Sequence, residues 1–278
     1  MTLLRSELTK IFFQKRTYIG WLALAAIPVL VAVALRFGDP GSGGGPGGGG
    51  AGAGQDTGFF TLATDNGLLV PLVAITMLAS FFLPLVASMA GGFQLAGEAE
   101  SSTLKTWLIH PVGRGSVVLS KWFTAVLYVF AGLGLAALAG YAAGIPFFGA
   151  GSFTLLSGGT VSVGHGLWLT LLAYLYVGLA MVAVVSISML LSELTDSSLT
   201  AAIGTLVIVI VMQIVGQLSY FDFLAPYLFT SRLDTWQTLF QGSIDWTSIW
   251  KGVLAFVVYG GVGLAATWHL FRRKDVLV

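Results

Sequence analysis

The chain has 278 residues, of which 56% are hydrophobic and only 9% are charged, and its formal net charge is +1. Soluble domains are about 25% charged, so this composition excludes a soluble globular protein, and the absence of a basic patch excludes a nucleic-acid partner. Cysteine is absent, which excludes a disulfide framework and a thiolate nucleophile. We therefore expect an all-α integral membrane protein.

The first 16 residues combine apolar and basic side chains in a helical pattern. Leu4, Leu8 and Phe12 share one face, which predicts an interfacial amphipathic helix over residues 1–16. A signal peptide is the alternative. It is disfavoured because the following apolar run is long and no small-residue cleavage site closes it.

Six apolar runs are long enough to cross the hydrocarbon layer, which needs about 20 residues. They cover residues 18–36, 67–91, 116–140, 166–191, 199–218 and 250–271. Pro28, Pro71 and Pro84 lie inside these runs and are expected to kink them. The whole chain is expected to form a single domain, a bundle of six transmembrane helices.

Lysine and arginine are distributed unevenly between the two sides of the spans. With the N-terminus inside, the outer segments hold only Arg36, Arg232 and Lys251 of the 13 basic residues. This asymmetry predicts a multi-pass cell-membrane protein with both termini in the cytoplasm.

The outer segments carry two features. Residues 37–66 contain the glycine-rich run DPGSGGGPGGGGAGAGQD. A phosphate-binding loop would end in Gly-Lys-Ser/Thr, which is absent here, so a flexible linker is expected.

Residues 219–249 place aromatic clusters on both sides of Pro226, which indicates an outer re-entrant or interfacial hairpin. A bare outer loop is the alternative.

A short inner loop is expected at Ser192–Ser198. Glu193 and Asp196 are predicted to form a second, smaller inner contact. A solvated turn, in which Asp196 or Ser197 caps the next helix, is an equal alternative.

The spans offer little chemistry. Lys121, Lys251 and His269 lie near span ends and are expected to snorkel. No Asp or Glu lies at mid-membrane, which argues against an ion-coupled carrier. The scattered histidines lack ligand spacing, so no metal site is expected. We interpret Gln213 and Gln217 as contacts between helices.

Residues 97–115, GEAESSTLKTWLIHPVGRG, are the one long polar segment with an internal pattern. Acidic residues come first, a short helix with one apolar face follows, and a proline and a basic turn end it. We expect this segment to bind a partner, although a helical cytoplasmic loop is an equal alternative. The candidate residues are Glu98, Glu100, Thr103, Leu104, Trp107, Leu108, Pro111 and Arg114.

This segment and the six-span layout resemble the membrane subunits of type-2 ABC exporters. In that family the second inner segment reads roughly Glu-x-Glu-x-Gly-Thr, a leucine-rich helix, Pro-x-x-Arg and a lysine that enters the third span. Glu98, Glu100 and Thr103 match the start, and Lys121 matches the end. Ser102 stands where glycine is usual, and the glycine-rich outer loop is not a family trait.

The resemblance implies a permease without a catalytic site or cofactor of its own. Residues 97–115 would be the coupling helix, seated on a separate cytoplasmic ATPase that binds ATP and Mg²⁺. Residues 1–16 would be the elbow helix, and residues 219–249 the re-entrant hairpin.

The same family pattern implies a second permease, a copy or a paralogue, in a prokaryotic cell membrane and in contact with its lipid. The cargo would be hydrophobic or amphipathic, such as a drug, peptide or lipid. A carrier, channel, membrane enzyme or assembly protein without ATPase coupling is the alternative.

Overall fold

The computed structural model describes residues 9, 15–37, 56–97, 114–155, 158–221, 223–241 and 244–273. This part of the chain is helical apart from its turns and a two-stranded hairpin. The expected elbow and coupling segments therefore lie outside the described residues except for Thr9, Lys15, Arg16, Gly97, Arg114 and Gly115.

Six helices in the described part are long and apolar enough to cross a membrane. The first is α2 (Lys15–Phe37). The second span is continuous but composite, and it joins η1 (Gly67–Leu69), α4 (Val70–Met77), the π-helical turn η2 (Leu78–Phe82) and α5 (Leu83–Gly92). The others are α8 (Arg114–Phe148), α9 (Val163–Leu194), α10 (Ser198–Gln217) and α11 (Trp246–Arg273).

The connecting segments also carry structure. Helix α3 (Asp56–Asp65) precedes the second span. Strands β1 (Phe153–Thr154) and β2 (Thr160–Val161) pair antiparallel between α8 and α9. Two 3₁₀ segments, η3 (Ser219–Phe221) and η4 (Phe229–Phe240), lie between α10 and α11.

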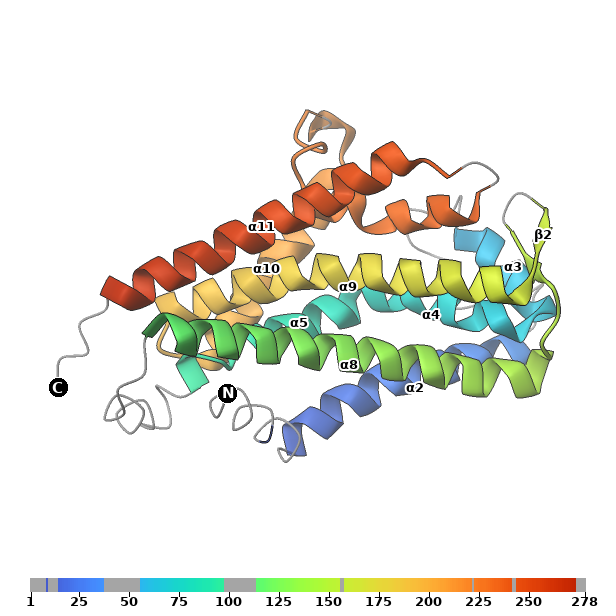
Figure 1. Ribbon diagram of the computed structural model, residues 1–278, viewed down its shortest axis with the longest axis horizontal. Coiled ribbons are helices and arrows are strands. Elements are labelled where there is room, and N and C mark those ends of the chain that lie inside the picture. Colours follow the sequence, from blue (N-terminus) through green and yellow to red (C-terminus); the bar gives the residue numbers. More distant parts are fainter. Residues whose placement is uncertain are drawn as a thin grey trace.

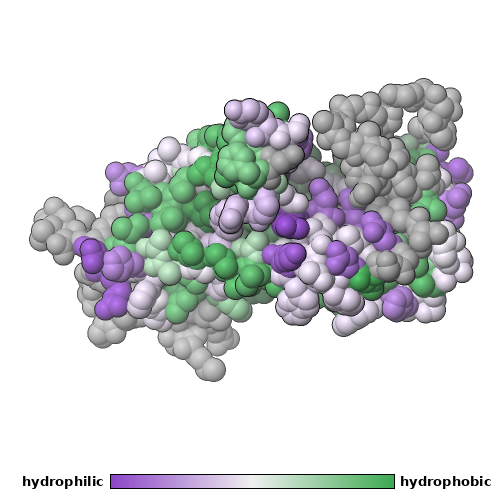
Figure 2. All heavy atoms as spheres, turned by 90° about the horizontal axis from the view of Figure 1, so that it is seen from above, coloured by the Kyte–Doolittle hydropathy of each residue, from purple (hydrophilic) through white to green (hydrophobic). Residues whose placement is uncertain are grey.

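The second span and α9 form the core of the bundle. They are the most buried of the six spans, whereas α2, α10 and α11 bury less than a third of their residues. Their exposed side chains are apolar, as at Leu22, Val207 and Leu254, and such a surface suits contact with lipid chains. Figure 2 shows a broad hydrophobic surface on one face, with hydrophilic residues at one end and toward the other.

The spans differ in length. At 1.5 Å per residue, the 20 residues of α10 extend about 30 Å, which matches the hydrocarbon thickness, whereas α8 extends about 52 Å. The bundle is therefore longer than the membrane is thick. We name the end where α8 and α10 begin the inner end, and the opposite end, which carries α3 and the strands, the outer end (Figure 1).

Aromatic packing holds the outer end together. Phe153, Trp236 and Phe240 are fully buried. The ring of Phe240 stacks on Phe153 at 5.9 Å and meets Trp236 edge-on at 6.1 Å. A Cβ on Gly166 would lie 2.3 Å from the Phe153 ring, so the start of α9 needs glycine there. These contacts bind β1, η4 and α9 into one body.

Asn66 joins the second span to the same body. Its Oδ1 accepts hydrogen bonds from the Leu68 amide at 3.0 Å and the Gly151 amide at 3.4 Å. Its Nδ2 donates to the Ser152 carbonyl at 2.9 Å. The Asn66 side chain therefore caps η1 and holds residues 151 and 152, which directly precede β1.

Several span boundaries differ from the sequence prediction, and two of these differences affect the description of the fold. The third span was expected to end at residue 140, but α8 continues to Phe148. Gly140 and Gly144 lie inside this helix, where the lack of a side chain lets it approach the second span. An added Cβ would lie 3.0 Å from Pro71 at Gly140, and 2.3 Å from the Gly67 carbonyl oxygen at Gly144. The inner loop expected at Ser192–Ser198 is shorter, because α9 extends to Leu194.

Replacing Trp236 with alanine is expected to destabilise the protein. The side chain is fully buried in the aromatic core, and truncating a buried Trp costs about 3–5 kcal/mol. Thermal unfolding of purified protein in detergent should show a clear fall in midpoint. Trp250→Ala is the matched control, because Trp250 is 66% exposed on α11. Equal midpoints for the two variants would contradict the prediction.

Candidate functional site

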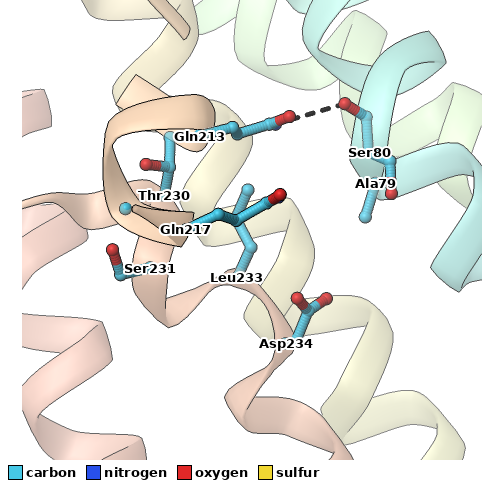
Figure 3. Close-up of a pocket in the computed structure, with 9 residues that line it drawn as sticks. Ala79, Ser80, Gln213, Gln217, Thr230, Ser231, Leu233 and Asp234 are labelled. Atoms are coloured by element: carbon cyan, nitrogen blue, oxygen red, sulfur yellow. Dashed lines mark hydrogen bonds between the residues drawn. The ribbon is translucent and has the colours of Figure 1, made fainter. Parts of the chain in front are cut away.

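A pocket of about 230 Å³ opens between the second span, α10 and η4. Figure 3 shows its walls, with Ser80 on one side and η4 on the other. Most of the lining groups are polar, which is unusual among spans as apolar as these. The lining residues are Ala79, Ser80, Gln213, Gly216, Gln217, Thr230, Ser231, Leu233 and Asp234.

The second-span wall is formed where its helix is broken. In an α-helix the amide of residue 84 would donate to the carbonyl of residue 80, but Pro84 has no amide hydrogen. The π-helical turn η2 precedes this proline, and the Leu83 amide bonds to the Leu78 carbonyl, five residues back. The break therefore deprives the Ser80 carbonyl of its α-helical donor.

Gln213 supplies the missing donor from α10. Its Nε2 lies 3.1 Å from the Ser80 carbonyl oxygen, and this bond crosses one side of the pocket (Figure 3). The Ser80 hydroxyl donates to the Thr76 carbonyl of its own helix at 3.0 Å. Gln213 thus links two spans, in agreement with the interpretation of this glutamine as a helix contact. No hydrogen bond of Gln217 is found within the described part of the chain, so that interpretation does not extend to it.

The η4 wall is anchored by tyrosines of two other helices. The Tyr176 hydroxyl of α9 donates to the Arg232 carbonyl at 2.8 Å, and the Tyr259 hydroxyl of α11 donates to the Tyr227 carbonyl at 3.0 Å. A Cβ on Gly216 would lie 2.6 Å from the Ser231 hydroxyl, so α10 approaches η4 closely. This wall is therefore built by contacts distant in sequence.

The chemistry of the pocket is hydrogen bonding. It offers amides, hydroxyls and the exposed carboxylate of Asp234. The Thr230 hydroxyl is buried and has no hydrogen-bond partner among the described residues. Those residues include no group of three or more His, Cys, Asp or Glu able to hold a metal ion.

Asp245 directly precedes α11. Its carboxylate accepts hydrogen bonds from the Thr247 amide at 3.0 Å, the Ser248 amide at 3.2 Å and the Ser248 hydroxyl at 2.6 Å. The bonds from Ser248 hold the pKa of Asp245 below its usual value. This N-cap fixes the entry of the last span.

At the inner end, Glu193 and Asp196 occupy different environments. Glu193 lies in α9, is only 7% exposed and is engaged by other residues, whereas Asp196 is exposed in the turn before α10. The Ser197 side chain caps α10 by accepting from the Thr200 amide. Only Asp196 of the two acids therefore has the exposure that a contact with a partner needs, and that role stays a prediction.

Two residues of the inner end were placed differently by the sequence. Lys121 was expected to snorkel, but it is 3% exposed and interacts with other residues. Ser192 was assigned to a loop, but it lies in α9 and bonds to the end of the second span. The serines at positions 188 and 192, one helical turn apart, are the signal in the sequence that could have revealed this contact.

The predicted coupling residues cannot be compared with the structure in the same way. Glu98, Glu100, Thr103, Leu104, Trp107, Leu108 and Pro111 lie outside the described residues. Arg114 is the first residue of α8. Gly97 ends the described segment that follows α5.

Comparison with known proteins gives one match along nearly the whole chain. The profile of a family described as "ABC-2 family transporter protein" matches residues 5–276. The probable ABC transporter permease protein NosY of Stutzerimonas stutzeri is 33% identical over 96 residues, 31% of this chain and 35% of that protein.

The protein of the same name from Pseudomonas aeruginosa is 37% identical over 70 residues, 24% of this chain and 26% of that protein. The alignments thus cover about a third or less of these two relatives.

A double-mutant cycle tests the bond between Gln213 and the break. Gln213→Leu should destabilise the protein by about 0.6–1.7 kcal/mol, because the Ser80 carbonyl loses the donor that replaces its α-helical partner. In a Pro84→Ala background the same change should cost less, since residue 84 then has an amide that can bond to Ser80. Unfolding in detergent micelles measures both costs. Gln217→Leu is the control one turn along α10, and equal costs in both backgrounds would refute the assignment.

Proposed function

This chain belongs to the ABC-2 family of transporter proteins, and from that membership we propose that it is the permease subunit of an ATP-binding-cassette transporter. It forms half of a translocation pathway that a separate cytoplasmic ATPase drives. The observation that carries the proposal is the family match over residues 5–276, which includes the first and the last span.

The distribution of charge supports an external energy source. Coupled carriers use ionisable groups within the membrane. The buried Asp, Glu, Lys or Arg residues of the described spans are Lys121, near the start of α8, and Glu193, near the end of α9. No Asp or Glu occurs in the middle of any span. Energy is therefore supplied by ATP bound to the partner subunit with Mg²⁺.

The contact with the ATPase is formed by residues 97–115. Leu104 and Trp107 provide its apolar anchor, since buried aromatic residues often dominate interfaces, and Leu108 extends the same face. Glu98, Glu100 and Arg114 hold its angle through ion pairs or helix-end contacts. Thr103 and Pro111 mark its start and end, and Asp196 adds a second inner contact.

The orientation follows from the basic residues. Both termini lie in the cytoplasm, the elbow helix of residues 1–16 lies along the inner surface, and the inner end of the bundle faces the ATPase. The segment 219–249, which contains η3 and η4, lies at the outer surface.

The pathway runs between this permease and a second one, and the polar pocket lies along it. Its amides, hydroxyls and carboxylate stand beside an apolar surface. This combination favours an amphipathic cargo, whose polar part bonds to the pocket and whose apolar part contacts the spans. Export is the direction that the family implies.

Trp107→Ala tests the proposed ATPase contact. Loss of an anchor aromatic costs about 2 kcal/mol or more, so we expect the affinity for the ATPase to fall by about thirtyfold. Co-purification and ATPase activity of the co-expressed subunits measure the effect. Trp250→Ala, on the exposed face of α11, should leave both unchanged. If the wild-type chain captures no ATPase, an assembly protein or a carrier without ATPase coupling becomes the better assignment.

Cysteine labelling tests the orientation, because the natural chain contains no cysteine. Asp196→Cys in the inner turn should react with a membrane-impermeant maleimide only after cells are permeabilised. Thr160→Cys in β2 should react in intact cells. Both positions are exposed, so the inverse pattern would place the inner end outside and exclude contact with a cytoplasmic ATPase.

A further inference from the structure

The second span ends in a turn that the hydroxyl of Ser192 holds. After α5, the Phe93 amide bonds to the Met89 carbonyl, and the Gln94 amide bonds to the Gly91 carbonyl. The Gly92 carbonyl is one of the groups that a helix end leaves without an α-helical donor. The Ser192 hydroxyl of α9 donates to it at 2.6 Å.

The same hydroxyl accepts two hydrogen bonds. The Ala96 amide lies 2.9 Å from the Ser192 Oγ, and the Leu95 amide lies 3.3 Å from it. A serine hydroxyl has one donor and two acceptor positions, so the hydroxyl uses its full capacity on one short segment of another span. Ser192 is 2% exposed, and water does not replace these bonds.

Close backbone contact surrounds this attachment. A Cβ on Gly91 would lie 2.5 Å from the Val185 carbonyl oxygen of α9, and a Cβ on Gly92 would lie 3.0 Å from the Ala202 amide nitrogen of α10. One turn before Ser192, the Ser188 hydroxyl donates to the Ser88 carbonyl of α5. The end of α5 is therefore held between α9 and α10 over two turns.

Helix α9 is also bonded to α8, the helix that follows residues 98–113 in the chain. The Trp122 Nε1 of α8 donates to the Ser186 hydroxyl at 2.8 Å. Since α5 precedes and α8 follows residues 98–113, both ends of this segment are attached to the same part of α9. Helix α11 joins it, because a Cβ on Gly263 would lie 3.0 Å from the backbone of Ser186.

We infer that Ser192 is a positioning residue that makes the exit of the second span and α9 move as one body. This inference rests on the proposed function: a displacement of residues 97–115 by the ATPase passes through the turn at Leu95–Ala96 into α9. Most buried hydroxyls of the spans bond within their own helix, as Ser120 does to Ser116. The bonds of Ser192 all cross to the end of the second span and the turn that follows it.

Hydrogen exchange on the permease alone tests the attachment. In Ser192→Ala the amides of Leu95 and Ala96 lose their acceptor, and their exchange should accelerate by about threefold to tenfold, the range for one net hydrogen bond. Ser192→Thr restores the hydroxyl and should restore slow exchange. Ser120→Ala, which removes an equally small buried hydroxyl within one helix, should change nothing in this segment.

A distance measurement in the complex tests the transmission. Spin labels at Leu22→Cys on α2 and Leu171→Cys on α9, both exposed, report the position of α9 after a non-hydrolysable ATP analogue and Mg²⁺ are added. The nucleotide-induced shift should be present in the parent and Ser120→Ala chains, lost in Ser192→Ala and regained in Ser192→Thr. ATPase co-purification should persist in all four.

The outcomes separate the two proposals. Unchanged exchange in Ser192→Ala, or faster exchange with the distance shift intact, would overturn the inference and leave the proposed function standing. A wild-type chain that binds no ATPase would overturn both. Should Ser192→Ala unfold, Ser192→Cys, which keeps a weak donor of similar size, takes its place, and a full distance shift with fast exchange would again refute the inference.

Discussion

The structure depends on one constraint: a backbone polar group in an apolar layer needs a partner from the protein, because water and lipid chains do not supply one. The second span meets this constraint twice. Pro84 removes the donor for the Ser80 carbonyl, and the end of α5 leaves the Gly92 carbonyl open. Side chains of neighbouring helices supply both donors, Gln213 from α10 and Ser192 from α9.

These two hydrogen bonds lie at the two places to which we assign a function, the polar pocket and the turn before the proposed ATPase contact. The break at Pro84 opens one wall of the polar pocket, and the turn after α5 leads into the segment that is proposed to bind the ATPase. One span thus connects the proposed site of energy input with the proposed site of cargo contact. It is also among the most buried spans, so it packs against neighbouring helices along most of its length.

The two ends of the bundle are stabilised by different interactions. At the outer end, aromatic rings pack around Trp236, and two tyrosine hydroxyls anchor η4 and the turn before it. At the inner end, serines and glycines bring the backbones of α5, α9 and α10 together. Small side chains permit closely packed helices to approach, and hydroxyls bond where amides and carbonyls are exposed. The inner end is therefore joined through backbone contacts, and the outer end through large side chains.

The sequence by itself determined the membrane class, the number of spans and the position of the polar segments, because crossing a hydrocarbon layer requires long apolar runs that are visible in one dimension. It also predicted kinks at Pro28, Pro71 and Pro84, of which Pro84 follows a π-helical turn, and it interpreted Gln213 as a link between helices. It placed Ser192 in a loop and Lys121 at the lipid interface, whereas both are buried. The hydroxyl that satisfies Gly92 lies 100 residues away, and the polar pocket joins residues 79 to 234. Which helices are neighbours is a property of packing, so only the tertiary structure decided which side chain meets which unpaired backbone group.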